Sequence, residues 1–434
     1  MRDIIITLIV FGAVPWIIRK PSIGILVWSW LAYMNPHRMS WGFAYNLPFS
    51  AVTAIAIFIG FIFSKEPKRI PLTPVTVVWG LFILWMLVTT FFAIHPEAAF
   101  IEMKKVIKIQ VMAIFTLMLM TNRERINQLV WVIAFSIGFF GIKGGIFTIL
   151  TAGQYRVWGP PETFIEGNNE IALALIIVMP LLRYLQQQTT NIWISRAILG
   201  TMVLSGFAIL ASYSRGALLA GAAMLVSLWW KGRNRFVAAI MIVIMIVSII
   251  PFVPEKWTSR METIDTYQED ASAMGRINAW HFAYNLASDR PVLGGGFQVF
   301  TEDMFLIYAP HPYDYHDAHS IYFEILGEQG YVGLVLFLLL WLLTLKSGQW
   351  VIVRTSKRED LSWAHDLASM LQVSLIGYMV GGAFLGLAYF DLPYHIMVLM
   401  LLTRTMVEQK LDAAPLQSPE QESAARLNSE SGRI

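Results

Sequence analysis

The chain alternates between long apolar runs and short polar connections. The run from 236 to 253 contains no charged residue, and a membrane-spanning helix needs about 20 apolar residues. Strands of a membrane barrel would alternate polar and apolar residues, so these continuous runs predict helices. Spans are predicted at residues 3–17, 22–34, 48–64, 75–93, 104–120, 127–150, 168–186, 193–213, 216–231, 235–253, 319–345, 366–388 and 392–408. We therefore expect an all-α fold, a polytopic membrane bundle of about 12 to 13 helices.

Basic residues occupy every second connection between these runs. By the positive-inside rule, these connections are cytoplasmic and the alternate ones face outward. The long interval 254–318 falls on the outer side and is rich in acidic residues. The first two runs are short, so they are either two thin spans or one broken hairpin. The basic residues are Arg19, Lys20, Lys65, Lys68, Arg69, Arg123, Arg125, Lys231, Arg233, Arg235, Lys346, Arg354, Lys357 and Arg358.

The pattern divides the chain into four parts. Residues 1–253 form the amino-terminal membrane helices, 254–318 one large external loop, and 319–410 the carboxy-terminal membrane helices. Residues 411–434, rich in Gln, Ser, Glu and Ala, are predicted to be a disordered cytoplasmic tail. Within the external loop, apolar residues recur at helical spacing and predict a short amphipathic helix that lies along the membrane or caps the bundle. These residues are Met274, Ile277, Trp280, Tyr284 and Ala287.

Composition agrees with this setting and narrows the chemistry. The chain is 56% hydrophobic and 14% charged, which is more apolar than a soluble domain. It has no cysteine, which excludes disulfides, a thiolate nucleophile and thiolate metal ligands. The first apolar run lacks a small-residue cleavage motif and leads into further spans, so we expect it to be retained rather than cleaved as a signal peptide.

Arg215 is the first candidate for chemistry. It stands in Ser214-Arg215-Gly216 at the outer end of a span, where a charge costs roughly 2.5–3.5 kcal/mol on insertion scales. A guanidinium binds phosphate oxygens in a bidentate manner, and the following glycine lets a ligand come close. The alternative is an arginine that reaches to the interface without a further role.

Other external cations could join it. Arg276 opens the amphipathic segment, where a helix N-terminus favours anions, although a solvated surface arginine is equally compatible. Arg156 adds a third external guanidinium. Lys104 and Lys105 lie near the outer end of their span and could attract a pyrophosphate, or could serve as interfacial anchors.

His319 is the candidate general base. Its near-neutral pKa suits proton transfer at ambient pH, and it precedes an apolar run at the membrane surface. His316 and Asp317 are close in sequence and could orient it, whereas a purely structural histidine is the alternative. A zinc site is a further alternative, and its ligands would come from His311, Asp314, His316, Asp317 and His319.

The segment Gly294-Gly295-Gly296 is a weaker signal. Three glycines could cradle a phosphate through their backbone amides. The segment lacks the Lys-Ser or Lys-Thr of a nucleotide loop and faces the wrong side for ATP. We therefore interpret it as a flexible turn.

Together these motifs resemble those of the O-antigen ligase and polymerase superfamily. The order and spacing agree over residues 150–345 through Ser214-Arg215-Gly216, Gly275-Arg276 with Trp280, Pro291-Val-Leu-Gly-Gly-Gly296, and Ala318-His319-Ser320 with Glu324, Gly327, Glu328, Gly330 and Gly333. The amino-terminal stretch, with Tyr33-Met-Asn-Pro-His-Arg38 and Trp41-Gly-Phe-Ala-Tyr45, is similar to the branch of O-glycosylation ligases associated with exosortase systems. One departure is Ser320, where the family often has asparagine.

The resemblance implies a GT-C-type, inverting glycosyltransferase of lipopolysaccharide biosynthesis. The glycan would move from undecaprenyl pyrophosphate to an acceptor hydroxyl, most often of lipid A-core, at the periplasmic face of the bacterial inner membrane. Carried over by position, Arg215 and Arg276 would bind pyrophosphate and His319 would activate the acceptor. Arg156, Lys104, Lys105 and His316 are expected to bind substrate. We expect no metal, no other cofactor and no nucleic acid. Membrane lipid is an expected partner.

Three alternatives stay open at this point. A protein hydroxyl could replace lipid A-core as acceptor. A polymerase would join one lipid-linked repeat to another. A transporter would need charged or broken helices near the bilayer midplane, whereas the notable charges here lie near one face.

Overall fold

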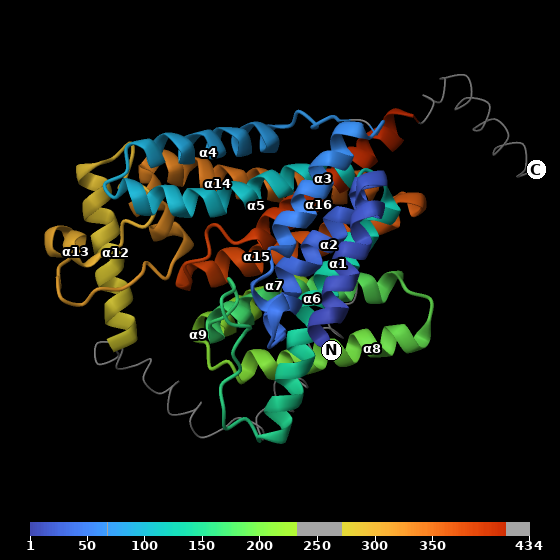
Figure 1. The fold of residues 1–434 in the computed structure, drawn as a ribbon, viewed down its shortest axis with the longest axis horizontal. Coiled ribbons are helices and arrows are strands. Elements are labelled where there is room, and N and C mark those ends of the chain that lie inside the picture. The colour runs from blue at the N-terminus through green and yellow to red at the C-terminus, as the bar shows by residue number, and fades with distance from the viewer. Residues whose placement is uncertain (67, 232–270, 414–434) are drawn as a thin grey trace, which may run out of the picture.

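The computed structural model describes residues 1–66, 68–231 and 271–413, and within these ranges the ordered elements are helices (Figure 1). They are α1 Arg2–Arg19, α2 Pro21–Met34, η1 Pro36–Met39, η2 Phe43–Asn46, α3 Phe49–Phe63, α4 Pro74–Phe91, α5 Pro96–Leu119, α6 Arg123–Leu150, α7 Asn168–Gln188, α8 Ile192–Leu210, α9 Arg215–Lys231, α12 Ala271–Asp289, α13 Glu302–Tyr308, α14 Ile321–Thr355, η5 Glu359–Leu361, α15 Ser362–Gly381, η6 Gly382–Phe384 and α16 Asp391–Asp412.

The predicted all-α membrane bundle is confirmed. Every predicted span inside the described residues coincides with a helix, and the span predicted at 235–253 lies outside them. In the described part, six segments are long and apolar enough to cross a bilayer, namely α4, α6, α7, α8, α14 and the stretch from η5 to η6. Two shorter apolar helices, α2 and α3, accompany them. The total of 12 to 13 spans stays a prediction.

Local signals in the sequence set the helix starts. Thr73 and Thr76 form a capping box in which each side chain bonds the backbone amide of the other, and Pro74 follows at the first helical position of α4. Asn122 caps α6 by accepting a hydrogen bond from the amide of Arg125 at 2.9 Å. Proline also opens α2 and α5. These devices satisfy amides that a helix N-terminus leaves without partners.

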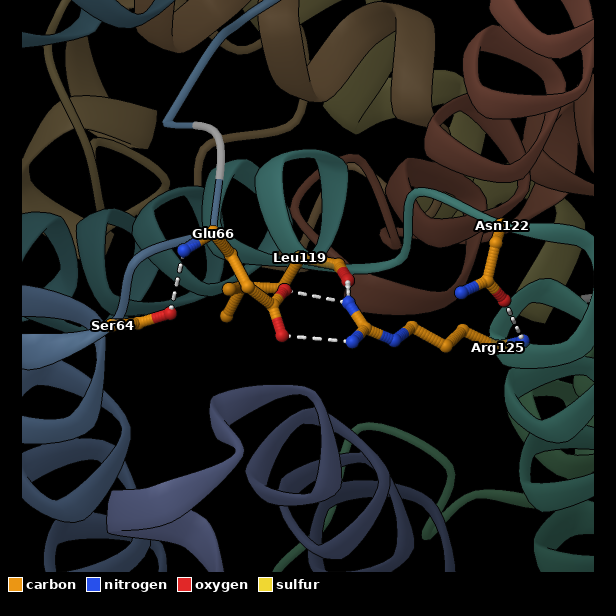
Figure 2. Close-up of polar contacts among 5 residues, drawn as sticks. All are labelled: Ser64, Glu66, Leu119, Asn122 and Arg125. Carbon is orange, nitrogen blue, oxygen red and sulfur yellow. Dashed lines mark hydrogen bonds and ion pairs between the residues drawn. The ribbon is translucent and has the colours of Figure 1, made fainter.

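An ion pair holds the connections at the predicted cytoplasmic end (Figure 2). The two terminal nitrogens of Arg125 donate to both carboxylate oxygens of Glu66, at 2.6 and 2.8 Å. The same guanidinium donates to the carbonyl of Leu119 at 2.7 Å. A bidentate pair is directional and stronger than a single contact. It therefore fixes the chain after α3 against the turn between α5 and α6.

Helices α12 and α13 lie at the opposite end of the long axis from the carboxy-terminal residues of α16 (Figure 1). Helix α12 packs against α14 and α13. Its buried face contains Ala279, Phe282, Ala283 and Leu286. The predicted amphipathic helix is thus present, but the predicted face is partly wrong, because Tyr284 is 55% exposed. Small residues, Ala279 and Ala283, thus share the buried face of α12 with Phe282 and Leu286.

Helix α14 is broken at Gly330, which has a left-handed backbone with φ of 67°. The amide of Tyr331 turns away from the helix and donates to the carbonyl of Pro291 at 2.9 Å. The carbonyls of Gly327 and Glu328 are thereby released from the helix. They accept hydrogen bonds from the amides of Gly295 and Gly296, both at 2.8 Å.

The triple-glycine segment is therefore a packed turn. The amide of Gly294 donates to the carbonyl of Arg290 at 2.9 Å, so all three glycine amides have partners inside the protein. They are not free to cradle a phosphate. The carbonyl of Gly295 also accepts from the amide of Ile94 at 2.8 Å, which attaches the connection between α4 and α5. The interpretation as a turn holds, but its backbone is bonded on both sides.

We predict that Gly330→Ala destabilises the protein by about 1–3 kcal/mol. An added Cβ would lie 2.5 Å from the carbonyl oxygen of Val292, in a backbone region that alanine disfavours. The measurement is thermal unfolding of the purified protein in detergent. The control is Gly221→Ala in α9, where an added Cβ meets no atom within 4 Å. Equal unfolding temperatures for the two variants would contradict the role of the break.

Candidate active site

A cavity of about 490 Å³ opens beside His319, at the end of the bundle that carries α12. We call it the His319 cavity. Its wall combines residues from α5, from the connection before α7, from the turn after Gly296, from the start of α14 and from the connection before α16. Segments that are far apart in sequence thus contribute to one enclosed space. The residues that carry polar groups into it are Glu102, Lys105, Thr163, Glu166, Glu170, Gln298, Asp317, His319, Glu324, Glu328 and Tyr389.

His319 lies in a strained backbone conformation directly before α14. Its φ is 41°, in the left-handed region that only a few percent of non-glycine residues adopt. Ser320 follows as the N-cap of α14, is 1% exposed and makes no side-chain cap bond. Strained residues that persist must be held by their surroundings. The backbone of His319 must therefore be held by contacts with neighbouring residues.

Trp280 of α12 supplies two of these contacts. Its indole nitrogen donates to the carbonyl of Ala318 at 2.9 Å, and its ring stacks on Phe323 with the ring centres 5.1 Å apart. Trp280 therefore contacts the chain on both sides of His319, at Ala318 and at Phe323. The sequence predicted Trp280 as part of the amphipathic helix and of a family motif, and its contacts here position the segment around His319.

Arg276 lies one helical turn before Trp280 and close to His319. Its positive charge acts on both His319 and Glu170. Gly275 is packed against the ring of His316, so that an added Cβ would clash with it. The amino-terminal turn of α12 therefore meets the loop that ends at His319. Arg276 and His319, predicted to act together, are brought together.

The electrostatic surroundings keep the imidazole of His319 neutral. Burial lowers its pKa below the ordinary value of 6.5, and the charge of Arg276 lowers it further. Asp317 raises the pKa and His316 lowers it, as smaller effects. A histidine with a lowered pKa is unprotonated at neutral pH and can accept a proton.

Arg215 is the first residue of α9. Its neighbour Gly216 lies against Phe384, whose Cβ would be 3.1 Å from an added Cβ. Gly382, in the same short helix as Phe384, lies against Ile321 at the start of α14. Arg215 thus belongs to the same end of the bundle as His319 and is linked to it through η6, although it does not line the cavity.

The two predicted lysines differ in their surroundings. Lys105 lines the His319 cavity, forms an ion pair with Glu102 at 3.2 Å, and lies 4.3 Å over the ring of Phe164. Lys104 is exposed on α5 and is not among the residues that line this cavity. Lys105 thus lies in the cavity wall, whereas the preceding residue, Lys104, lies on the outer surface of the helix.

Arg156 and His316 lie outside the cavity wall. Arg156 lines a separate groove of about 1180 Å³, which we call the amino-terminal groove, and its guanidinium carbon is 5.9 Å from the ring centre of Tyr213. His316 pairs with Asp314, with 2.9 Å between Nε2 and Oδ1. Among the described residues, no three His, Asp or Glu side chains are placed to hold a metal ion. The zinc alternative therefore has no ligand set here.

Glu102, Glu166, Glu170 and Tyr389 were not singled out from the sequence, and Glu324 and Glu328 were named there only as parts of the family motif. Glu328 accepts hydrogen bonds from the amide of Gln298 at 2.9 Å and from the hydroxyl of Tyr389 at 2.7 Å. Glu324 accepts from the amide of Ala388 at 3.1 Å. The carboxylates of Glu324 and Glu328 thus connect the start of α14 to the segments that form the other walls of the cavity. The available signal was their position in an apolar span, where an ionisable residue needs a partner.

Asn278 anchors the loop that leads to His319. Its side-chain nitrogen donates to the carbonyls of His311 and Asp314, both at 2.8 Å, and its oxygen accepts from the amide of His311 at 2.9 Å. Asn278 is 2% exposed, so water cannot easily replace these bonds.

We predict that Asn278→Ala destabilises the loop by about 1–3 kcal/mol, because it leaves buried backbone groups without partners. Hydrogen exchange of the amides from 311 to 319 measures this directly. Asn285→Ala is the control, since Asn285 lies on the same helix, is exposed, and makes one bond to the carbonyl of Tyr308. Equal exchange rates in the two variants would show that Asn278 does not anchor the loop.

Comparison with known protein families fits this geometry. Residues 200–338 match the O-antigen ligase family, and residues 1–190 match a family of unknown function, DUF5935. No curated protein matches the chain. The first match contains Arg215, Arg276, Trp280, His319 and the broken part of α14. Residues 200–338 therefore form a domain of the O-antigen ligase superfamily.

Proposed function

We propose that the protein transfers a glycan from undecaprenyl pyrophosphate to an acceptor hydroxyl, with His319 as general base. The observation that carries this proposal is the position of His319 in the wall of a cavity, with the segment of Arg276 packed beside it through the contact of Gly275 with His316, inside the O-antigen ligase domain. Arg276 itself is not among the described residues that line the cavity. A neutral imidazole and a fixed positive charge are the two groups that such a transfer needs.

In the proposed step, the acceptor oxygen attacks the anomeric carbon of the glycan. A new carbon–oxygen bond forms while the bond from that carbon to the pyrophosphate oxygen breaks, with inversion at carbon. The leaving undecaprenyl pyrophosphate keeps the electron pair, and the acceptor proton moves to the imidazole of His319. Arg276, joined by Arg215, would stabilise the negative charge that grows on the pyrophosphate.

The carboxylates of the wall restrict where a diphosphate could lie. Glu324 and Glu328 are engaged with backbone amides, and Glu102 pairs with Lys105. Asp317 and Glu170 line the same space. An anionic group would therefore lie on the Arg276 side, whereas sugar hydroxyls suit the carboxylate side because carboxylates accept their hydrogen bonds.

The proposed setting is the inner membrane of a bacterium, with the cavity facing the periplasm. This follows from basic residues at the opposite end of the helices, among them the Arg125 that binds Glu66. The acceptor we propose is the hydroxyl of lipid A-core, and the proposed role is lipopolysaccharide maturation. The exosortase-associated branch is part of this proposal.

We predict that Arg215→Ala, Arg276→Ala and His319→Ala each lower glycan transfer by at least about 100-fold, the scale of a lost base or charge clamp. The assay incubates purified protein with lipid-linked glycan and either lipid A-core or a protein acceptor. His281→Ala is the control, because this histidine is exposed on α12 and bonds only the carbonyl of Ile277 in its own helix.

The same assay separates the related activities. Products that form only with lipid A-core support the proposed ligase, and products that form only with protein indicate a protein glycosyltransferase. Ladders that grow on the lipid donor without any acceptor indicate a polymerase. Wild-type transfer by the His319→Ala variant would remove that residue from the mechanism.

The pH dependence of transfer provides a second prediction. His319 must be neutral to accept a proton, so activity is lost as pH falls through its lowered pKa, below 6.5. Asp317→Asn removes a group that raises this pKa and moves the acidic limb of the profile to lower pH. His316→Gln removes a group that lowers it and moves the limb to higher pH. Shifts in the same direction would contradict His319 as the base.

A further inference from the structure

The amino-terminal groove is lined only by residues from 2 to 161, all within the part of the chain that matches the family of unknown function. None of its lining residues belongs to the O-antigen ligase domain. Arg156, predicted from the sequence to bind substrate, lines this groove, whereas the residues of the proposed transfer step, Arg215, Arg276 and His319, do not. Its volume of about 1180 Å³ exceeds that of the His319 cavity. The ligand of the amino-terminal groove can therefore be considered apart from glycan transfer.

Charge is the first indication of the occupant. Four cations line the groove, Arg2, Arg38, Lys143 and Arg156, and among its described lining residues there is no aspartate or glutamate. Arg38 is compensated from outside by Glu162, at 2.5 Å. The remaining three cations give the groove a positive potential, which favours an anionic ligand.

Lys143 has an unusual position. It lies seven residues before the end of α6, a helix long and apolar enough to span the membrane. At about 1.5 Å per residue, its Cα is roughly 10 Å below the helix end. An ionisable residue at such a depth normally faces a cavity or a functional partner. Lys143 is exposed and lines the groove.

The remaining lining is apolar and aromatic. Trp41 is 94% exposed, Trp158 is 59% exposed and Phe147 is 42% exposed. Tryptophan at the boundary of a membrane contacts lipid headgroups and the first part of the acyl chains. A ligand that is anionic at one end and apolar along its length matches both parts of the lining.

We propose that the amino-terminal groove binds an anionic phospholipid of the surrounding bilayer. The phosphate lies near Arg156 and Lys143, and the acyl chains lie along the aromatic residues. This binding requires no glycan transfer, so it can be tested apart from the proposed function. If Lys143 only extended its side chain to the membrane interface, the protein would show no selectivity for the lipid headgroup.

The test uses the full chain purified in detergent and supplied with phosphatidylglycerol or phosphatidylcholine. Bound lipid is counted by native mass spectrometry. We expect the wild type to retain phosphatidylglycerol in preference to phosphatidylcholine. Lys143→Gln and Arg156→Gln should each weaken this retention by about fivefold, and the double variant by about 25-fold.

Arg196→Gln is the matched control, because Arg196 is an exposed arginine on α8, a helix that is apolar enough to span the membrane and packs against α6, and it does not line the groove. It should retain phosphatidylglycerol like the wild type. Equal retention of the two lipids by the wild type would overturn the proposal, as would full retention by the double variant. A dimer that forms without lipid and separates in the double variant would also overturn it, since a second copy would then occupy the groove.

Discussion

The break of α14 at Gly330 is the constraint on which the site depends. A continuous helix would engage the carbonyls of Gly327 and Glu328 with the amides of residues 331 and 332. The left-handed Gly330 redirects Tyr331 toward Pro291, and the two freed carbonyls accept the amides of Gly295 and Gly296. The same turn holds Ile94. One glycine therefore joins the external loop to α14 and to the connection between α4 and α5.

This junction also determines the geometry of the cavity wall. Glu328, whose backbone carbonyl binds the turn, uses its carboxylate to accept the amide of Gln298 and the hydroxyl of Tyr389. The backbone and the side chain of one residue thus hold two walls of the His319 cavity. On the other side, α12 holds the histidine segment through Asn278 and Trp280. The strained backbone of His319 persists because both of its flanks are fixed.

The helices could be predicted from sequence because each apolar run is long enough to decide its own structure in lipid. The contacts between runs could not. On α12, hydrophobicity favoured Tyr284, whereas close packing is achieved by Ala279 and Ala283, which a hydrophobic pattern undervalues.

The same distinction applies to the candidate site, where local motifs could be predicted from sequence and contacts between distant segments could not. Arg276 and His319 were found because each lies in a short polar motif at the outer surface. Glu102 was missed because the segments that complete its cavity wall, such as the start of α14, are remote in sequence and on other helices. The assignment of Arg156 to the outer side stays a prediction, and sequence does not give the position of a residue around the bundle. The structure puts it in the amino-terminal groove instead.

The His319 cavity and the amino-terminal groove differ in the charge of their linings. Among the described residues that line the His319 cavity, six carry carboxylates and one, Lys105, carries a fixed positive charge, so the cavity itself disfavours an anion. A third groove, of about 900 Å³, shares Lys105 and Phe164 with the His319 cavity and shares Arg38 and Tyr45 with the amino-terminal groove. Arg38, Lys105 and Lys108 line this third groove together with Glu162, Glu166 and Asp391, so the connection between the two spaces carries charges of both signs. Under the two proposals above, lipid would bind in the amino-terminal groove and sugar in the His319 cavity, because lipid phosphates follow positive charge and acyl chains follow apolar walls.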